Sequence, residues 1–186
     1  EAAAEPRPGG GGPARTCHVD TFVRDNLPPP HRMPDFINLD RLGYPEQLNA
    51  TVELVDRHVE AGHGERVALV GQGVTGQDVT WTYAELKRQI DRMANVLVDK
   101  LGLVPGGRVL LRSANNPTKV ALYLAVIKAG GIVVATMPLL RARELTQILD
   151  KARIPLALCD AGLIDEMTKA AEGRTEPVRV VTWRGT

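Results

Sequence analysis

Three cationic side chains stand where an α/β protein could present them to a phosphate group. Arg141 and Arg143 begin a predicted helix directly after a strand that ends near Met137 and Pro138, and Lys169 lies on a later helix. A guanidinium binds a phosphate through two parallel hydrogen bonds, and an ammonium binds it as a point charge. These cations are therefore candidate phosphate ligands, and the alternative is that they cover a solvated helix face.

Polar residues and one thiol lie at the ends of two other predicted strands. Ser113 follows a strand directly, and the carboxyl ends of strands are where open α/β sheets bind ligands. Ser113 has no glycine elbow and no general base near it in the sequence, so a nucleophilic role is disfavoured. A turn and a helix N-cap explain Asn115 and Asn116. Cys159 ends an apolar run and is expected to be a small core residue rather than a reactive thiolate.

Residues 71–76, with the sequence GQGVTG, have the glycine spacing of a dinucleotide-binding loop. Such a loop must lead into a helix whose N–H groups hold the pyrophosphate, whereas the strand-like residues 78–81 follow here. A β-hairpin turn is therefore favoured over a dinucleotide site. The sequence has no Walker-type phosphate loop and no His-Glu-x-x-His or Cys-x-x-Cys motif. The histidines are expected to be solvated: His18, His31, His58 and His63. No catalytic residue and no metal site is predicted.

The elements around these residues predict an α/β fold with a parallel sheet covered by helices. Four strand-like segments alternate with three helices, and the segments lie near residues 106–112, 132–135, 154–160 and 178–183. The first of these helices ends at Gly130 and Gly131, and the strand that follows is expected to be buried on both faces. The order of the strands in the sheet is not predicted.

The amino-terminal third is expected to wrap around this sheet. Residues 1–17 are rich in glycine, proline and alanine and are predicted to be a disordered tail. Residues 18–64 are predicted to form a Pro-rich extended segment with a short helix near 20–26 and an amphipathic helix over 49–61. Residues 65–186 are then the α/β subdomain, which begins with the hairpin and is expected to be incomplete.

Capping residues mark the start of two helices. Thr82 and Glu85 form a predicted capping box, in which the Thr82 hydroxyl accepts from the Glu85 N–H and the Glu85 carboxylate accepts from the Thr82 N–H. Asn116 is a predicted N-cap, and Pro117 occupies the first helical position after it. Both helices therefore have boundaries that the sequence defines by itself.

The composition excludes several classes of function. The 186 residues contain 23 Lys and Arg against 22 Asp and Glu, so a formal charge of +1 attracts neither nucleic acid nor an anionic membrane surface. A hydrophobic content of 44% is enough for a real core. No run approaches the roughly 18 apolar residues that would cross a bilayer. Cys17 and Cys159 have no disulfide or zinc-ligand spacing, which fits a reducing cytoplasm.

Several blocks of sequence, in order, resemble the adenylate-forming superfamily, the AMP-producing acyl-CoA and aryl-CoA ligases. These blocks are VTWTYAEL, GLVPGGRVLL, NNPTKVALYLAVIKAGGIVVATMPLL and QILDKARIPLALCD. Three further blocks resemble benzoate-CoA and 2-aminobenzoate-CoA ligases: DTFVRDNLPPP, NATVELVDRHVEAGHGERVA and ATMPLLRARELTQILDKA. The resemblance implies the fold of the N-terminal subdomain of these enzymes.

The resemblance also implies a two-step ligase reaction. A carboxylate attacks the α-phosphate of Mg-ATP, pyrophosphate leaves, and the thiol of coenzyme A then captures the acyl-adenylate. The implied ligands of the full-length protein are ATP, Mg2+, coenzyme A and an aromatic carboxylate. The family's phosphate loop, adenine segment, ribose-binding Asp and C-terminal Lys have no counterpart in this sequence. The segment is therefore expected to be inactive alone and to need the rest of its own chain.

In relatives, the loop after the second strand lies near the nucleotide of coenzyme A. The resemblance therefore implies contact candidates in that loop, which are Met137, Pro138 and Leu139. Weaker candidates for the same nucleotide are the nearby cations Arg141, Arg143 and Lys169.

Three alternatives stay open at this point. The first is a stand-alone doubly wound module that binds a nucleotide or coenzyme A without catalysis. The second is a dinucleotide-dependent oxidoreductase that uses residues 71–76. The third is a purely structural or interaction protein.

Overall fold

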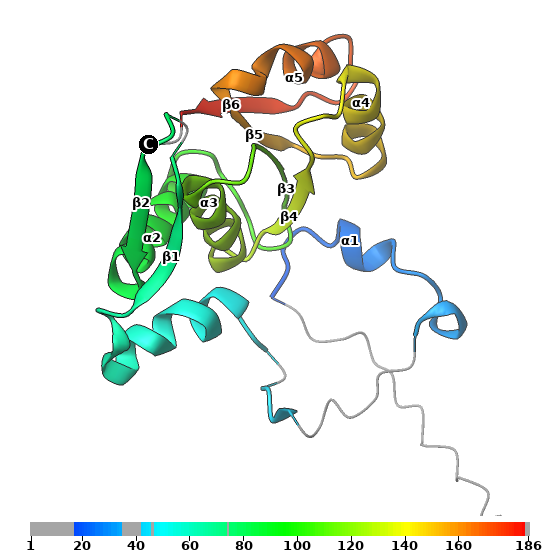
Figure 1. The fold of residues 1–186 in the computed structure, drawn as a ribbon. Coiled ribbons are helices and arrows are strands. Elements are labelled where there is room, and N and C mark those ends of the chain that lie inside the picture. Colours follow the sequence, from blue (N-terminus) through cyan, green and yellow to red (C-terminus); the bar gives the residue numbers. More distant parts are fainter. Residues whose placement is uncertain (1–16, 35–41, 46, 74, 185–186) are drawn as a thin grey trace, which may run out of the picture.

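The computed structural model describes residues 17–34, 42–45, 47–73 and 75–184 (Figure 1). The predicted disordered tail, residues 1–17, lies outside these residues except for residue 17. In the part of the chain that is described, none of the helices has the length and the apolar character needed to cross a membrane.

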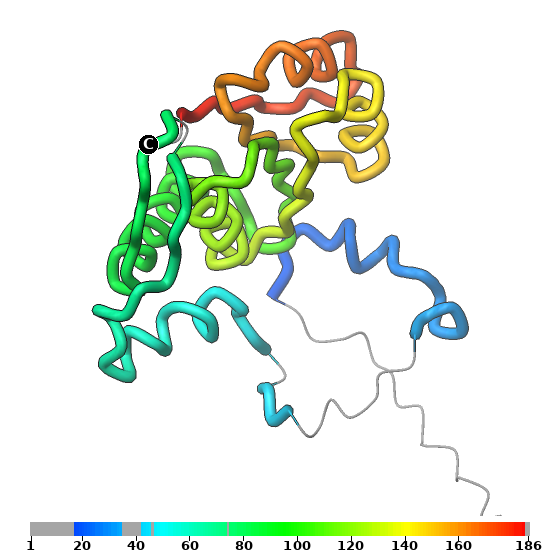
Figure 2. The backbone as a smooth tube through the Cα atoms, viewed as in Figure 1, coloured from blue at the N-terminus to red at the C-terminus, as the bar shows by residue number. Residues whose placement is uncertain are grey.

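The centre of the fold is a parallel sheet of four strands in the order β4-β3-β5-β6. In chain order the strands are β3 (Arg108–Arg112), β4 (Ile132–Thr136), β5 (Leu156–Asp160) and β6 (Arg179–Trp183). β4 pairs with one side of β3, and the chain then passes through α4 (Ala142–Lys151) to the other side of β3, where it forms β5 (Figure 2). The predicted parallel sheet is confirmed, and the structure adds that the strand order reverses direction between β3 and β5.

Helices cover both faces of this sheet, as predicted. On one face lie α2 (Tyr83–Asp99) and α3 (Pro117–Lys128), and on the other lie α4 (Ala142–Lys151) and α5 (Ile164–Ala171). Val109 and Leu111 of β3 pack against the first pair of helices, whereas Leu110 packs against the second pair. Because alternate side chains of a strand point to opposite faces, β3 is apolar on both sides and fully buried along its length.

β4 differs from the expectation that it would be buried on both faces. Ile132, Val133 and Val134 are only partly buried and Ala135 is exposed, because β4 forms an edge of the described sheet. Thr136, the last residue of the strand, is buried. Gly130 has φ of +79° and provides the left-handed turn before the strand. Gly131 is required for another reason, since a Cβ atom there would lie 2.9 Å from Cγ1 of Val126. Close packing of α3 on β4 therefore depends on both glycines.

The two predicted helix caps are confirmed. The Glu85 N–H donates to the Thr82 hydroxyl at 3.2 Å, and the Thr82 N–H donates to the Glu85 carboxylate at 2.9 Å. At the start of α3, the Lys119 N–H donates to the Asn116 side chain at 2.8 Å. Pro117 is the first residue of that helix.

The amino-terminal third carries short helical turns. They are α1 (Phe22–Asp25), η1 (Pro30–Arg32), η3 (Val52–Asp56) and η4 (Val59–His63). The amphipathic helix expected over residues 49–61 is helical, but η3 and η4 have π-type rather than α-type hydrogen bonding. Two hydrogen bonds attach this segment to α3: the Thr51 hydroxyl donates to the Leu124 carbonyl at 2.7 Å, and Lys128 donates to the Asp56 carboxylate at 2.7 Å.

The predicted hairpin is formed by β1 (Val67–Gln72) and β2 (Asp78–Thr82), which pair antiparallel. The hairpin is a separate two-stranded sheet beside α2 and α3. Gly76 has φ of +82° in its turn. Because a strand rather than a helix follows these glycines, the dinucleotide-binding interpretation of residues 71–76 is wrong.

Candidate functional site

A crevice of about 700 Å³ lies at the carboxyl ends of β3 and β5, and we call it the switch-point crevice. Open α/β sheets bind ligands where the strand order reverses, and the order here reverses between these two strands. The crevice is lined by the hairpin turn and by the ends of β3, β5 and β6 with the residues that follow them. The lining residues are Gln72, Gly73, Thr75, Ala114, Asn115, Asn116, Asp160, Ala161, Gly162, Leu163 and Arg184. This is the position at which the fold would present a ligand.

Two polar side chains of this crevice, Asn116 and Asp160, are hydrogen-bonded to the buried Ser113, which is not itself part of the lining. The Ser113 hydroxyl lies 2.9 Å from the Ala114 carbonyl, 3.2 Å from the Asn116 side-chain nitrogen and 3.4 Å from the Asp160 carboxylate. Asp160 also accepts from the Gly162 N–H at 2.9 Å. Ser113 is completely buried. These bonds fix the turns after β3 and β5, so the arrangement supports the cap and turn interpretation rather than a nucleophilic serine.

Arg112 lies at the end of β3, and it is almost completely buried, with 1% of its surface exposed. Its guanidinium donates to three carbonyls in the loop after β4, those of Met137, Pro138 and Leu140, at 2.9 to 3.0 Å. The Arg112 Nε also donates to the Leu163 carbonyl after β5, at 3.4 Å. One side chain therefore connects the two loops that follow the neighbours of β3.

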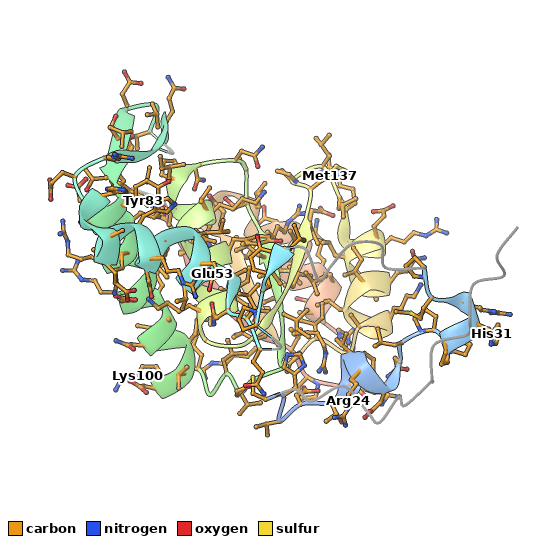
Figure 3. The ribbon with its side chains drawn as sticks, turned by 90° about the horizontal axis from the view of Figure 1, so that it is seen from below. Arg24, His31, Glu53, Tyr83, Lys100 and Met137 are labelled. Carbon is orange, nitrogen blue, oxygen red and sulfur yellow. The ribbon has the colours of Figure 1, made fainter. Side chains whose placement is uncertain are left out.

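The loop of residues 137–140, which we call the 137–140 loop, contains the first three candidate residues. Met137 is 63% exposed and Leu139 is 83% exposed, although both are apolar. Pro138 is half-buried between them. Figure 3 shows Met137 at the opposite side of the molecule from Arg24 of the amino-terminal segment. The structure thus places these candidates together at the carboxyl edge of the sheet, with their side chains available for contact.

Glu166 links the start of α4, where Arg141 and Arg143 lie, to Lys169 of α5. Glu166 of α5 accepts from the Ala142 N–H at the start of α4 at 2.8 Å and from Lys169 at 3.1 Å. These hydrogen bonds, together with the charge of Arg141, hold the pKa of the Glu166 carboxyl below its usual value. Arg141 and Lys169 therefore share one corner of the molecule. Arg143 is exposed on the first turn of α4.

Cys159 is a core residue, as expected. Its side chain is fully buried next to Met167 and Ala170. Burial raises the pKa of the Cys159 thiol to about 11, with a smaller contribution in the same direction from Asp160, against the opposing charge of Arg112. The thiol is therefore protonated at neutral pH and does not act as a nucleophile.

The remaining candidates form no reactive cluster. His58 and His63 lie in and beside η4, where the His58 ring is 4.5 Å from the ring of Tyr83. His31 is exposed on η1. Among the described residues, no group of His, Cys, Asp and Glu has the arrangement of a metal site.

Sequence reasoning missed two residues at this edge, Arg112 and Glu166. The signal for Arg112 was an arginine at the last position of a strand, RVLLR, whose interior is wholly apolar. A charged residue in a strand buried on both faces must find partners at the end of that strand. Glu166 had no comparable signal, because its partner is the N–H of a residue 24 positions earlier.

Comparisons with known proteins agree with this architecture. A family model described as "AMP-binding enzyme" matches residues 55–185. Crystal structures of similar fold include a benzoate CoA ligase from Burkholderia xenovorans LB400, with a TM-score of 0.64 and 21% identity over 74% of this chain and 26% of that chain. Another is an anthranilate CoA ligase in complex with anthranoyl-AMP, with a TM-score of 0.66 and 18% identity over 76% of this chain and 26% of that chain.

Among curated relatives, an acetyl-coenzyme A synthetase from Streptomyces avermitilis is 43% identical over 84 residues. This match covers 45% of the present chain and 13% of the relative. The chain therefore spans only a small part of the length of the relatives it matches.

Proposed function

Because the chain belongs to the AMP-binding enzyme family, whose model matches residues 55–185, we propose that it is part of an AMP-forming acyl-CoA ligase. In the proposed reaction, a carboxylate and ATP form an acyl-adenylate and pyrophosphate. The thiol of coenzyme A then takes the acyl group, and AMP is released. The family match, which extends over the whole doubly wound sheet, is the observation that carries this proposal.

We propose further that the acid is aromatic, namely benzoate or 2-aminobenzoate. Two observations support this branch: the three blocks of sequence between residues 20 and 152 that resemble such ligases, and the similar folds of a benzoate and an anthranilate CoA ligase. The competing candidate is a short aliphatic acid, because an acetyl-coenzyme A synthetase is 43% identical over 84 residues.

In this proposal, the described residues contribute to binding of coenzyme A rather than to bond making. The 137–140 loop would contact the nucleotide of coenzyme A, and Arg141, Arg143 and Lys169 offer cations to its phosphates. The groups that bind Mg-ATP and the acid would come from the rest of the same chain. A cytoplasmic setting belongs to the proposal as well, since Cys17 and Cys159 are both free thiols.

The test uses the full-length protein that carries this chain. Acid-dependent exchange of pyrophosphate into ATP is measured with benzoate, 2-aminobenzoate and acetate, each without coenzyme A. Exchange that is fastest with an aromatic acid supports the proposal. Exchange with acetate alone would exclude an aromatic substrate but would still support an AMP-forming ligase. No exchange with any acid of a broader panel would exclude the ligase function itself.

A second candidate is a module that binds a nucleotide or coenzyme A without catalysis. The observation in its favour is the switch-point crevice, which is formed within this chain alone. Calorimetric titration of residues 1–186 with ATP and with coenzyme A separates the two functions. Micromolar binding by this segment, together with no exchange activity in the full-length protein, would favour the module.

A further inference from the structure

We propose that Arg112 is a positioning residue that holds the 137–140 loop in the conformation that receives coenzyme A. This inference rests on the proposed function, because that function is what assigns coenzyme A to the loop. Arg112 itself does not reach the ligand in this proposal. It acts through the backbone of the loop.

The hydrogen bonds of Arg112 define how the loop is held. Three carbonyls of a four-residue loop, from Met137, Pro138 and Leu140, converge on one guanidinium. A fourth bond, to Leu163, joins the same guanidinium to the turn after β5. The loop is therefore attached to a side chain that is itself fixed at the carboxyl end of β3, an interior strand of the sheet.

The burial of Arg112 makes this attachment rigid. Arg112 is 1% exposed, so water does not reach its guanidinium, and the backbone carbonyls are its hydrogen-bond partners. Loss of these carbonyls would leave a buried charge without hydrogen bonds, which is costly. Its planar guanidinium presents five N–H donors in fixed directions, whereas a lysine ammonium would offer three donors on a flexible stem. An arginine can therefore donate hydrogen bonds to several carbonyls at once.

The outer side of the loop shows the opposite property. The side chains of Met137 and Leu139 are 63% and 83% exposed. The carbonyl of Met137 and the two carbonyls on either side of Leu139 nevertheless accept hydrogen bonds from the buried Arg112. The loop thus presents exposed apolar side chains on a backbone that does not need to be ordered when a ligand binds. Preorganisation of this kind improves affinity by lowering the entropy cost of binding.

The test compares Arg112→Met with Arg108→Met in the full-length protein. Arg108 is the matched control, because it is the other buried arginine of β3 and its hydrogen bonds lie at the opposite end of the strand. Two quantities are measured: acid-dependent pyrophosphate exchange, which needs no coenzyme A, and thioester formation as a function of coenzyme A concentration.

We expect Arg112→Met to raise the KM for coenzyme A by about tenfold to a hundredfold, far more than it slows pyrophosphate exchange. Arg112→Lys should recover part of this loss, since it restores the charge and some of the donors. Arg108→Met should leave the KM for coenzyme A unchanged. If Arg112→Met does not fold, Pro138→Gly loosens the same loop and should raise the same KM.

Two results would overturn the inference. One is an unchanged KM for coenzyme A in folded Arg112→Met, or in Pro138→Gly where the first variant does not fold. The other is an equal fall of both half-reactions, because a general loss of structure would produce it. If the wild-type protein shows no pyrophosphate exchange with any acid of the broader panel, the proposed function is overturned, and this inference with it.

Discussion

Each end of β3 carries a buried arginine, but the two arginines bind different partners. At the amino end, Arg108 donates to the carbonyls of Ala152 and Arg153 and forms an ion pair with Asp20 at 2.5 Å. At the carboxyl end, Arg112 donates to the carbonyls of the loops after β4 and β5. Both arginines donate to backbone carbonyls of neighbouring segments, but among the described residues only Arg108 pairs with a carboxylate of the amino-terminal segment.

The amino end is closed by the chain's own amino-terminal segment. The Arg108 guanidinium lies 4.4 Å from the centre of the Phe22 ring, and the N–H groups of Val19 and Asp20 donate to the Pro105 carbonyl at 2.9 Å. The carboxyl end has a fixed backbone but exposed side chains. The difference indicates that the amino end provides stability, whereas the carboxyl end leaves exposed the surface to which the proposed function assigns coenzyme A.

The largest expected difference between the two ends is in thiol reactivity. Cys17, in the exposed amino-terminal segment, should react with iodoacetamide at pH 8 at least about a hundredfold faster than Cys159, because burial suppresses the Cys159 thiolate. Peptide mass spectrometry after timed labelling gives both rates. Similar rates would show that the carboxyl end opens readily, contrary to the account, and Arg112→Met should raise the Cys159 rate alone.

Removal of the amino-end contact should cost stability. We expect Arg108→Met to lower the free energy of unfolding by about 3 kcal/mol, because it leaves the Asp20 carboxylate unpaired and two carbonyls without their donor. Urea denaturation followed by circular dichroism measures this change. The control is Arg57→Met, which removes an exposed arginine paired with Glu53 and should cost less than about 0.5 kcal/mol. Equal losses in the two variants would contradict the role given to Arg108.

The amino end should also be the more sensitive of the two to acid. Burial acts to raise the pKa of Asp20, but the hydrogen bonds from Arg108 and from the Phe22 N–H outweigh it and lower the pKa. A lowered folded-state pKa means that this contribution is fully present above the unfolded value of 3.8 and is lost as the pH falls through the folded value. Asp20→Asn should therefore weaken the dependence of stability on pH below about 4. An unchanged pH profile in that variant would refute this assignment.

The smallest effect is expected at the exposed corner beside the 137–140 loop. Lys169→Ala removes an exposed ion pair with Glu166 and should change the free energy of unfolding by less than about 0.5 kcal/mol. The substitution does not remove the other partner of Glu166, which is the Ala142 N–H. A loss above 1 kcal/mol in the same urea assay would mean that this corner is structural rather than available for binding.

Local patterns predicted much of the fold. The capping box at Thr82 and the N-cap at Asn116 lie within four residues of their partners, so the sequence alone specifies them. The alternation of strand-like and helical segments is also a local pattern, and it predicted the parallel sheet. Strand order and the partial exposure of β4 depend on which strands meet across the chain, and no local pattern encodes that.

The candidate site was less predictable than the fold. The resemblance indicated the 137–140 loop, but the residue that holds it, Arg112, lies 25 positions before Met137. The switch-point crevice could not be located before the strand order was known. Contacts between distant segments therefore account for most of what the sequence did not show.

Amide hydrogen exchange tests the contrast between the two ends of β3 most directly. The exchange rates of wild type, Arg108→Met and Arg112→Met are compared in the full-length protein at the N–H groups of Leu139, Leu140, Val19 and Asp20. The account predicts faster exchange at Leu139 and Leu140 only in Arg112→Met, and faster exchange at Val19 and Asp20 only in Arg108→Met. Uniform acceleration in both variants, or no acceleration of the loop in Arg112→Met, would contradict it.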